Sequence, residues 1–301
     1  MNIRSILSGL AKAAVLCAMA ATAPAQIFVT NSHDNTIGEY ATSGEPVNPA
    51  LVSGLSFPGG IAVSGGHIFV TNANTNTIGE YTTSGVTVNP TLVSGLSDPI
   101  GIAVSGGNLF VTNETNGTIG EYTTSGATVN PALVSGLNFP NRIAVSGGNL
   151  FVTNRGAGTI GEYTTSGATV NPALVSGLSD PDGIAVSGGN LFVTNLSNGT
   201  IGEYTTSGAM VNASLVSGLS FPRGIAASGG DLFVVINGAS AIGEFTTSGV
   251  TVNSALVSRL NGPVDIAVVT ASVPDTPSTM ALLLVALTAM LGLKLMLRQP
   301  A

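Results

Sequence analysis

The sequence predicts an all-β protein, a six-bladed β-propeller built from 41-residue repeats. One phenylalanine recurs with this period, at Phe28, Phe69, Phe110, Phe151, Phe192 and Phe233. One glutamate recurs in the same register, at Glu39, Glu80, Glu121, Glu162, Glu203 and Glu244. No helical periodicity occurs between residues 26 and 270. A fixed repeat of this length is typical of solenoids, propellers and arrays.

Each repeat contains four strand signals. In the copy that begins at Gly101, the apolar runs GIAV and NLFVT are separated by a Ser-Gly-Gly turn, and TIGEYTT and ALVSGL follow after polar loops. Four antiparallel strands in about 40–45 residues make one propeller blade. The repeat therefore predicts one blade per copy.

The two ends of the repeat region predict a closed ring. The chain enters in mid-repeat at QIFVTN and leaves after PVDIAVV, so the first copy lacks its GIAV strand and the last segment supplies one. We expect Ile266–Val269 to pair beside Ile27–Thr30 and to complete the sixth blade. Closure removes exposed sheet edges, whereas an open solenoid is expected to carry polar capping repeats, and the sequence has none.

The segments outside the repeats predict export. Residues 1–25 have basic residues, an apolar run and a small-residue site ending at Ala25, as in a signal peptide. Residues 26–271 form the predicted propeller, and 272–301 form a tail. Residues 280–297 of this tail are apolar enough to span a bilayer, with Lys294 and Arg298 on the cytoplasmic side.

Charge and cysteine content exclude several classes of partner and site. Between residues 26 and 270 four Arg face fourteen Asp and Glu, a net charge of −10. Nucleic acid and anionic membrane surfaces are therefore not expected partners. The single cysteine, Cys17, lies in the predicted signal peptide, so the mature domain has no disulfide and no thiolate metal site. We expect no cofactor.

The copies differ mainly in two loops, the one after FVTN and the linker before GIAV. In propeller topology both loops emerge on the same face, and binding residues concentrate on loops held by a rigid scaffold. Neutral drift in tolerant loops is the alternative explanation. The candidate binding face comprises His33, Asp34, Asp98, Glu114, Arg142, Arg155, Asp180, Asp182, Arg223, Asp265, Phe57, Phe139 and Phe221.

The residue before the linker proline alternates between Phe and Asp over the first five linkers. Phe57, Phe139 and Phe221 would form a ring that stacks on a sugar or peptide, or would serve as aromatic plugs between the blades. The sequence favours the plugs.

The recurring glutamate also has two interpretations, as a ring of ligands or as a local cap for backbone and hydroxyl groups of the third strand. A residue kept in every copy usually serves the blade, so we expect the local role. The aromatic residue that follows each glutamate is predicted to pack in the core: Tyr40, Tyr81, Tyr122, Tyr163, Tyr204 and Phe245.

The unit PxGIAVSGGNLFVTNxxNGTIGEYTTSG resembles the NHL repeat and the repeats of the streptogramin B lyase family. The resemblance covers all six copies and implies the propeller fold. It does not fix the function, because NHL-type propellers are mainly binding platforms and a minority are lactonases and lyases.

The tail resembles the PEP-CTERM class of sorting signals, in its VPDSG variant, through Val273, Pro274, Asp275, Thr276, the apolar segment and the basic end. This resemblance implies an exosortase-like sorting protease as partner and a transient inner-membrane stage before delivery to the cell surface, outer envelope or extracellular space. A permanent C-terminal membrane anchor is the alternative.

The expected function is that of a binding or structural module in the cell envelope or matrix, with an unknown protein or glycan ligand. The sequence shows no Ser-His-Asp set and no metal-spaced histidine pair, and His33 and His67 are predicted on opposite faces. No catalytic residue is therefore assigned. One alternative is a lactonase- or lyase-like enzyme that uses a divalent cation on the variable-loop face. Another is an adhesive array without a discrete ligand.

Overall fold

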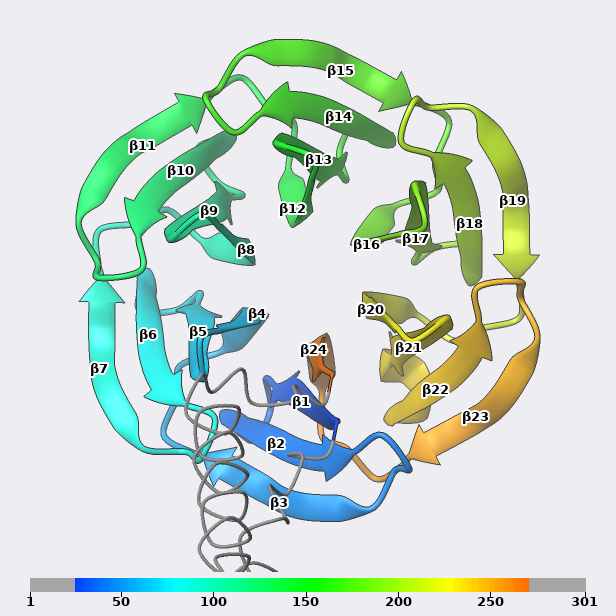
Figure 1. The fold of residues 1–301 in the computed structure, drawn as a ribbon, viewed down its shortest axis with the longest axis horizontal. Helices are drawn as coiled ribbons and strands as arrows, with labels where there is room; N and C mark the ends of the chain where they lie inside the picture. The colour runs from blue at the N-terminus through cyan, green and yellow to red at the C-terminus, as the bar shows by residue number, and fades with distance from the viewer. Residues whose placement is uncertain (1–24, 271–301) are drawn as a thin grey trace, which may run out of the picture. The chain divides into compact units, whose positions relative to one another are not determined.

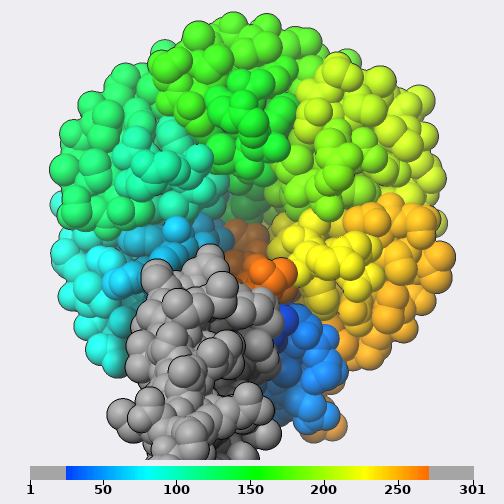
Figure 2. Space-filling model, viewed as in Figure 1, coloured from blue at the N-terminus to red at the C-terminus, as the bar shows by residue number. Residues whose placement is uncertain are grey.

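The computed structural model describes residues 25–270, which form six four-stranded antiparallel sheets around one axis (Figure 1). The prediction of a six-bladed propeller is confirmed. Seen along this axis, the molecule has a hollow where the six blades meet (Figure 2). The signal peptide and the sorting tail lie outside the described residues, apart from Ala25. Within the described range no helix is long and apolar enough to cross a membrane.

Equivalent strands have nearly equal lengths in all blades. The innermost strands are β24 (Pro263–Val269), β4 (Pro58–Ser64), β8 (Pro99–Ser105), β12 (Pro140–Ser146), β16 (Pro181–Ser187) and β20 (Pro222–Ser228). The second strands are β1 (Gln26–Asn31), β5 (His67–Asn72), β9 (Asn108–Asn113), β13 (Asn149–Asn154), β17 (Asn190–Asn195) and β21 (Asp231–Ile236). The third strands are β2 (Thr36–Ala41), β6 (Thr77–Thr82), β10 (Thr118–Thr123), β14 (Thr159–Thr164), β18 (Thr200–Thr205) and β22 (Ala241–Thr246). The outer strands are β3 (Pro46–Val52), β7 (Thr87–Val93), β11 (Thr128–Val134), β15 (Thr169–Val175), β19 (Met210–Val216) and β23 (Thr251–Val257), and a short 3-10 turn η1 (Asn237–Ala239) follows β21.

We number the blades from the sheet β24-β1-β2-β3, which is blade 1, to β20–β23, which is blade 6. Blade 1 is the only blade in the described part of the chain that joins two distant segments. Strand β24 pairs antiparallel with β1 in the register Gln26 with Val269 and Val29 with Ile266. The predicted ring closure is therefore confirmed.

The hydrophobic core is divided into clusters that lie at the junctions between blades. At the junction of blades 1 and 2, Phe28 and Ile37 from one sheet pack with Ile68, Val70 and Tyr81 from the next. The predicted aromatic column is buried in every blade. Each sheet is thus apolar on both faces, which explains why its strands show continuous apolar runs in place of alternation.

The recurring glutamate has a local partner in five blades. The first residue of the second strand, which is Gln26, Asn108, Asn149 or Asn190, donates a side-chain amide hydrogen bond of 2.5–2.7 Å to it. In blade 2 the partner is His67, whose Nδ1 lies 2.8 Å from Glu80. The local role is confirmed, but the partners are side chains of the neighbouring strand, and the predicted backbone and hydroxyl partners were wrong.

Candidate functional site

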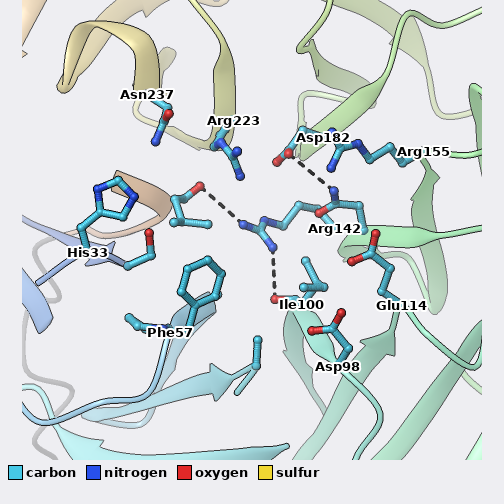
Figure 3. A pocket seen from close by; sticks show the side chains of 16 residues that line it. His33, Phe57, Asp98, Ile100, Glu114, Arg142, Arg155, Asp182, Arg223 and Asn237 are labelled. Atoms are coloured by element: carbon cyan, nitrogen blue, oxygen red, sulfur yellow. Dashed lines mark hydrogen bonds between the residues drawn. The ribbon is translucent and has the colours of Figure 1, made fainter. Parts of the chain in front are cut away.

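A cavity of about 330 Å³ opens on the axis, on the face that carries the variable loops. We call it the loop-face pocket. Residues of all six blades line it, and they come from both of the predicted loops. Eight of the thirteen candidate residues line this pocket: His33, Phe57, Asp98, Glu114, Arg142, Arg155, Asp182 and Arg223 (Figure 3).

The linker after each outer strand brings one residue per blade to the axis. This residue directly follows the linker proline and is Gly59, Ile100, Asn141, Asp182, Arg223 or Val264. A threonine of the preceding blade holds this residue in place, because its Oγ1 donates a hydrogen bond to the backbone carbonyl of the lining residue. Thr153 donates to Asp182 at 2.7 Å, and Thr194 donates to Arg223 at 2.6 Å. The same threonine oxygen also accepts a hydrogen bond from a backbone N–H of its own blade. For Thr194 the donor is Gly183, at 2.7 Å. Buried hydrogen bonds therefore hold the backbone beneath the pocket.

In each innermost strand, the residue that directly follows this lining residue lies close to the backbone of the neighbouring blade. Four blades have glycine here, and a Cβ at Gly101 or Gly183 would lie only 2.4 Å from a carbonyl oxygen of the next blade. The two exceptions are Arg142 in blade 4 and Asp265 in blade 1, three blades apart. Arg142 Nε lies 3.4 Å from Asp265 Oδ2, and both side chains are buried. An ion pair thus crosses the axis of the ring.

Arg142 also binds backbone groups of two other blades. Its guanidinium donates to the carbonyl of Ile100 at 3.1 Å and to that of Val264 at 3.4 Å (Figure 3). At the other junctions a threonine of the preceding blade donates to the carbonyl that corresponds to Val264. Blade 6 has Val235 at the position of this threonine, and the side chain of valine has no donor. Arg142 therefore supplies the hydrogen bond that Val235 cannot make.

Below the ion pair, one isoleucine from each blade surrounds a small cavity of about 80 Å³: Ile61, Ile102, Ile143, Ile184, Ile225 and Ile266. Burial raises the pKa of Asp265, and the nearby Arg142 charge opposes this rise. The Asp265 carboxylate also accepts a hydrogen bond from the backbone of Ile61 at 3.2 Å. The ion pair and the isoleucine ring form the floor of the loop-face pocket.

Carboxylates gather on one side of the pocket. Asp98 and Glu114 come from blade 3 and Asp182 from blade 5 (Figure 3). The pKa of Glu114 is raised first by burial and then by the charges of Asp98 and Asp182, although Arg155 and Arg142 lower it. Arg155 is engaged elsewhere, because its guanidinium forms a bidentate ion pair with Asp180. This pair lowers the pKa of Asp180.

Arg223 enters the pocket from blade 6, near Asn237 and His33 (Figure 3). Among residues 25–270 it forms no ion pair within 4 Å. Asn237 donates at 2.8 Å to the carbonyl of Pro263, and the ring of His33 lies against Gly262. This side of the pocket is therefore cationic and amide-rich, with Asp182 beside Arg223 and with Asp98 and Glu114 farther round the pocket (Figure 3).

Four polar atoms of lining residues have no hydrogen-bond partner within the described range: Asn141 Oδ1, Asp182 Oδ1, Arg142 Nε and Arg223 Nε. The residues Asn141 and Asp182 are only 4% and 1% exposed. A single weak contact joins them, from Asn141 Nδ2 to Asp182 Oδ2 at 3.5 Å. Leaving a buried polar atom unpaired costs about 1–3 kcal/mol, and buried polar atoms usually have a hydrogen-bond partner.

The prediction that the three linker phenylalanines plug the junctions was wrong. Phe57, Phe139 and Phe221 are 48%, 56% and 58% exposed. Their backbone φ angles are +54°, +49° and +50°, in the left-handed region that a bulky residue rarely adopts. The sixth copy has Gly262, which fits this turn without strain. Strained, exposed aromatic residues on one face favour a binding role over a packing role.

The remaining candidates lie at the edge of the pocket or outside it. Phe139 and Asp180 line a neighbouring cavity together with Glu114 and Arg155. Asp265 lies in the floor of the pocket. Asp34 lies on the surface and accepts a hydrogen bond from Asn261. Phe221 lines neither of the two cavities. His67 is at the opposite end of the β4–β5 hairpin, as predicted.

Three uncharged polar residues that line the pocket, Asn141, Asn237 and Ser32, were not among the predicted site residues. All three lie in the two variable loops, where the predicted residues are charged or aromatic. Asn141 and Asn237 occupy positions where other copies have different residue types, so position in the repeat was the signal that identifies them.

Residues 97–273 match the model of the virginiamycin B lyase family. The chain belongs to this family. The match covers more than half of the sequence, and it confirms the resemblance to streptogramin B lyases. No curated protein matches the chain.

Solved structures with the same fold include members of the virginiamycin B lyase family. Virginiamycin B lyase from Staphylococcus aureus matches with a TM-score of 0.63 and 24% identity, over 80% of this chain and 84% of that one. A chain of the nidogen/laminin complex matches with a TM-score of 0.72 and 16% identity, over 82% and 99%. A gluconolactonase from Xanthomonas campestris matches with a TM-score of 0.61 and 13% identity, over 73% and 85%. At these identities the likeness establishes the fold, which this propeller shares with lyases and lactonases.

Proposed function

We propose that this member of the virginiamycin B lyase family is a binding module whose loop-face pocket takes a small polar ligand. One observation carries the proposal: six nearly identical blades differ where they line the pocket, and buried polar atoms there have no described partner. Neutral drift accounts for variable loops, but it gives no reason for unpaired buried atoms on the axis.

The proposal includes export and surface display, as the terminal segments predict. A signal peptide cleaved after Ala25 and a PEP-CTERM-like tail would bring the propeller to the cell surface, outer envelope or extracellular matrix, with an exosortase-like protease as partner. Mass spectrometry of the mature protein checks both predicted cleavages. An intact tail that stays in the membrane fraction would support the permanent anchor.

Thermal unfolding in the presence of a library of sugars, amino acids, peptides and organic acids tests the binding function. A ligand at 100 times its dissociation constant adds about 2.7 kcal/mol, which corresponds to roughly 5–11 °C for a domain of this size. The shift should disappear in Asp182→Asn and persist in Asp231→Asn, because Asp231 begins β21 at the opposite end of the blade. Equal shifts in both variants would place the ligand outside the pocket.

Membership of a lyase family favours a second candidate, a lactonase- or lyase-like enzyme with a divalent cation on the loop face. A catalytically inactive variant of virginiamycin B lyase, in which a histidine is replaced by alanine, has been solved with quinupristin. His33 is the histidine that lines the pocket here. Residues 25–270 gather no group of three His, Cys, Asp or Glu that fits a metal ion.

Turnover of quinupristin and gluconolactone, with magnesium or calcium and then with a chelator, tests the enzyme candidate. Activity that is lost in His33→Ala but kept in His67→Ala would establish catalysis in this pocket. A rise in Tm on adding either cation would show that the native protein binds metal. No turnover and no shift would leave the binding function.

A further inference from the structure

Several charged side chains of the loop-face pocket form no ion pair within the described residues. Asp98, Glu114 and Asp182 lie on one side, and Arg223 reaches in from blade 6 near His33 and Asn237 (Figure 3). These groups come from four blades. Because each group is attached to its own blade, the rigid ring determines where each charge lies.

Two of the three pocket arginines are already neutralised. Arg142 is paired with Asp265 across the axis, and Arg155 is paired with Asp180 at the edge. Within residues 25–270, Arg223 has no ion pair, and the carboxylates of Asp98, Glu114 and Asp182 have none either. The pocket thus has one guanidinium and three carboxylates without an ion pair in this part of the chain.

Burial makes this arrangement unfavourable without a bound partner. Asp182 is 1% exposed and its Oδ1 has no partner, and the adjacent Asn141 Oδ1 is equally unpaired. Both atoms are acceptors, so they require a donor. The raised pKa of Glu114 has the same origin, because burial and the neighbouring carboxylates both disfavour its charge. A group that is cationic and carries several N–H donors would satisfy this side.

We infer that the ligand is a small zwitterion, with its ammonium group against Asp98, Glu114 and Asp182 and its carboxylate against Arg223. An ammonium has three donors and no acceptor, which suits the unpaired oxygens, and a guanidinium binds a carboxylate with two parallel hydrogen bonds. The inference rests on the proposed binding function and specifies its ligand class.

The size of the pocket and its rim are consistent with an amino acid. A cavity of about 330 Å³ lies at the small end of ligand pockets. Phe57 lines it with a half-exposed ring that offers an apolar surface to a side chain. An aromatic amino acid would place its ring there and its two charged groups on the two sides described above.

Four matched probes separate the two charges of the ligand: phenylalanine, phenylalaninamide, N-acetylphenylalanine and N-acetylphenylalaninamide. They carry both charges, the ammonium alone, the carboxylate alone, and neither. Isothermal titration of the full-length protein at pH 6, where the amino group of the amide is protonated, gives their affinities. Phenylalanine is expected to bind at least about tenfold more tightly than either singly charged probe, because each loses a charge-assisted hydrogen-bonded contact.

Variants assign each charge to its side chains. Arg223→Gln should abolish the preference for phenylalanine over phenylalaninamide, and Glu114→Gln should reduce its preference over N-acetylphenylalanine. Arg259→Gln and Asp231→Asn, which lie outside the pocket, should bind as the unmodified protein does. Circular dichroism melting confirms that each variant is folded.

Equal affinity for all four probes, or no binding up to about 10 mM, would overturn the zwitterion inference. The binding function has a separate test, because a different ligand from the library screen that depends on Asp182 would keep the pocket as a binding site. Selectivity that persists in Arg223→Gln would refute the assignment of the carboxylate to this residue.

Discussion

Removing either partner of the axial ion pair should destabilise the whole propeller. The natural replacement is glycine, which four blades already have at this position. In Arg142→Gly the Asp265 carboxylate stays buried without its counter-charge, and the carbonyl of Val264 loses its donor. Breaking a buried pair in this way costs about 3–5 kcal/mol, or roughly 6–20 °C in Tm for a domain of this size.

The double variant Arg142→Gly, Asp265→Gly separates the pair from its individual members. It removes both charges of the pair, so its cost should be smaller than the sum of the two single costs by at least about 2 kcal/mol. Calorimetry or urea unfolding of the four proteins gives this coupling. Arg155→Gln is the control, since it removes a partly exposed ion pair worth less than about 1 kcal/mol.

The deficit of Arg142→Gly should depend on pH. Burial raises the pKa of Asp265, and without the opposing Arg142 charge it should rise further. The native state then binds a proton more tightly than the unfolded state, so stability increases as pH falls from the folded pKa toward the ordinary value of about 3.9. The variant should therefore recover part of its loss as the pH is lowered from neutral toward about 4. Additive single costs and a deficit that does not vary with pH would refute the ion pair.

Three further predictions follow from burial. The five tyrosines of the chain are all buried and their pKa values are raised, so none should ionise before the protein unfolds. Because tyrosines of the unfolded state deprotonate first, the free energy of unfolding should fall above pH 10 by at most about 7 kcal/mol per pH unit. Tyrosinate absorbance that appears while the ellipticity is still native would contradict this. Replacing Phe57, Phe139 and Phe221 by Ser should change the free energy of unfolding by less than about 1 kcal/mol, since the rings are exposed, and a large drop in Tm would restore the plug hypothesis. Glu121→Ala should cost about 1–2 kcal/mol through the lost bond from Asn108, whereas Glu121→Gln keeps an acceptor and should cost less; equal losses in urea unfolding would deny that bond.

The uninterrupted 41-residue register predicted the blades, their number and the closing strand. Each strand is short and each turn has its own Gly or Asn signal, so local chemistry and the repeat point to the same fold. The loop face was predicted for the same reason, because topology alone places both variable loops on one side.

The contacts across the axis could not be predicted in this way. Arg142 and Asp265 are 123 positions apart, and no local pattern connects them. Their common signal was that each replaces a glycine at the same position of the repeat. The phenylalanines were misassigned because burial is the usual fate of an aromatic residue, whereas the left-handed backbone at this turn directs these rings outward. Gly262 in the sixth copy was the available hint.

The pairing of β1 with β24 also determines where the chain enters and leaves the propeller. Its first and last strand residues, Gln26 and Val269, face each other at one end of the pair, while Asn31 and Pro263 lie at the other end, next to the pocket residues Ser32 and Val264. These ends are separated by a strand length of roughly 17 Å. The chain therefore enters and leaves the propeller at the end of this strand pair that is remote from the loop-face pocket.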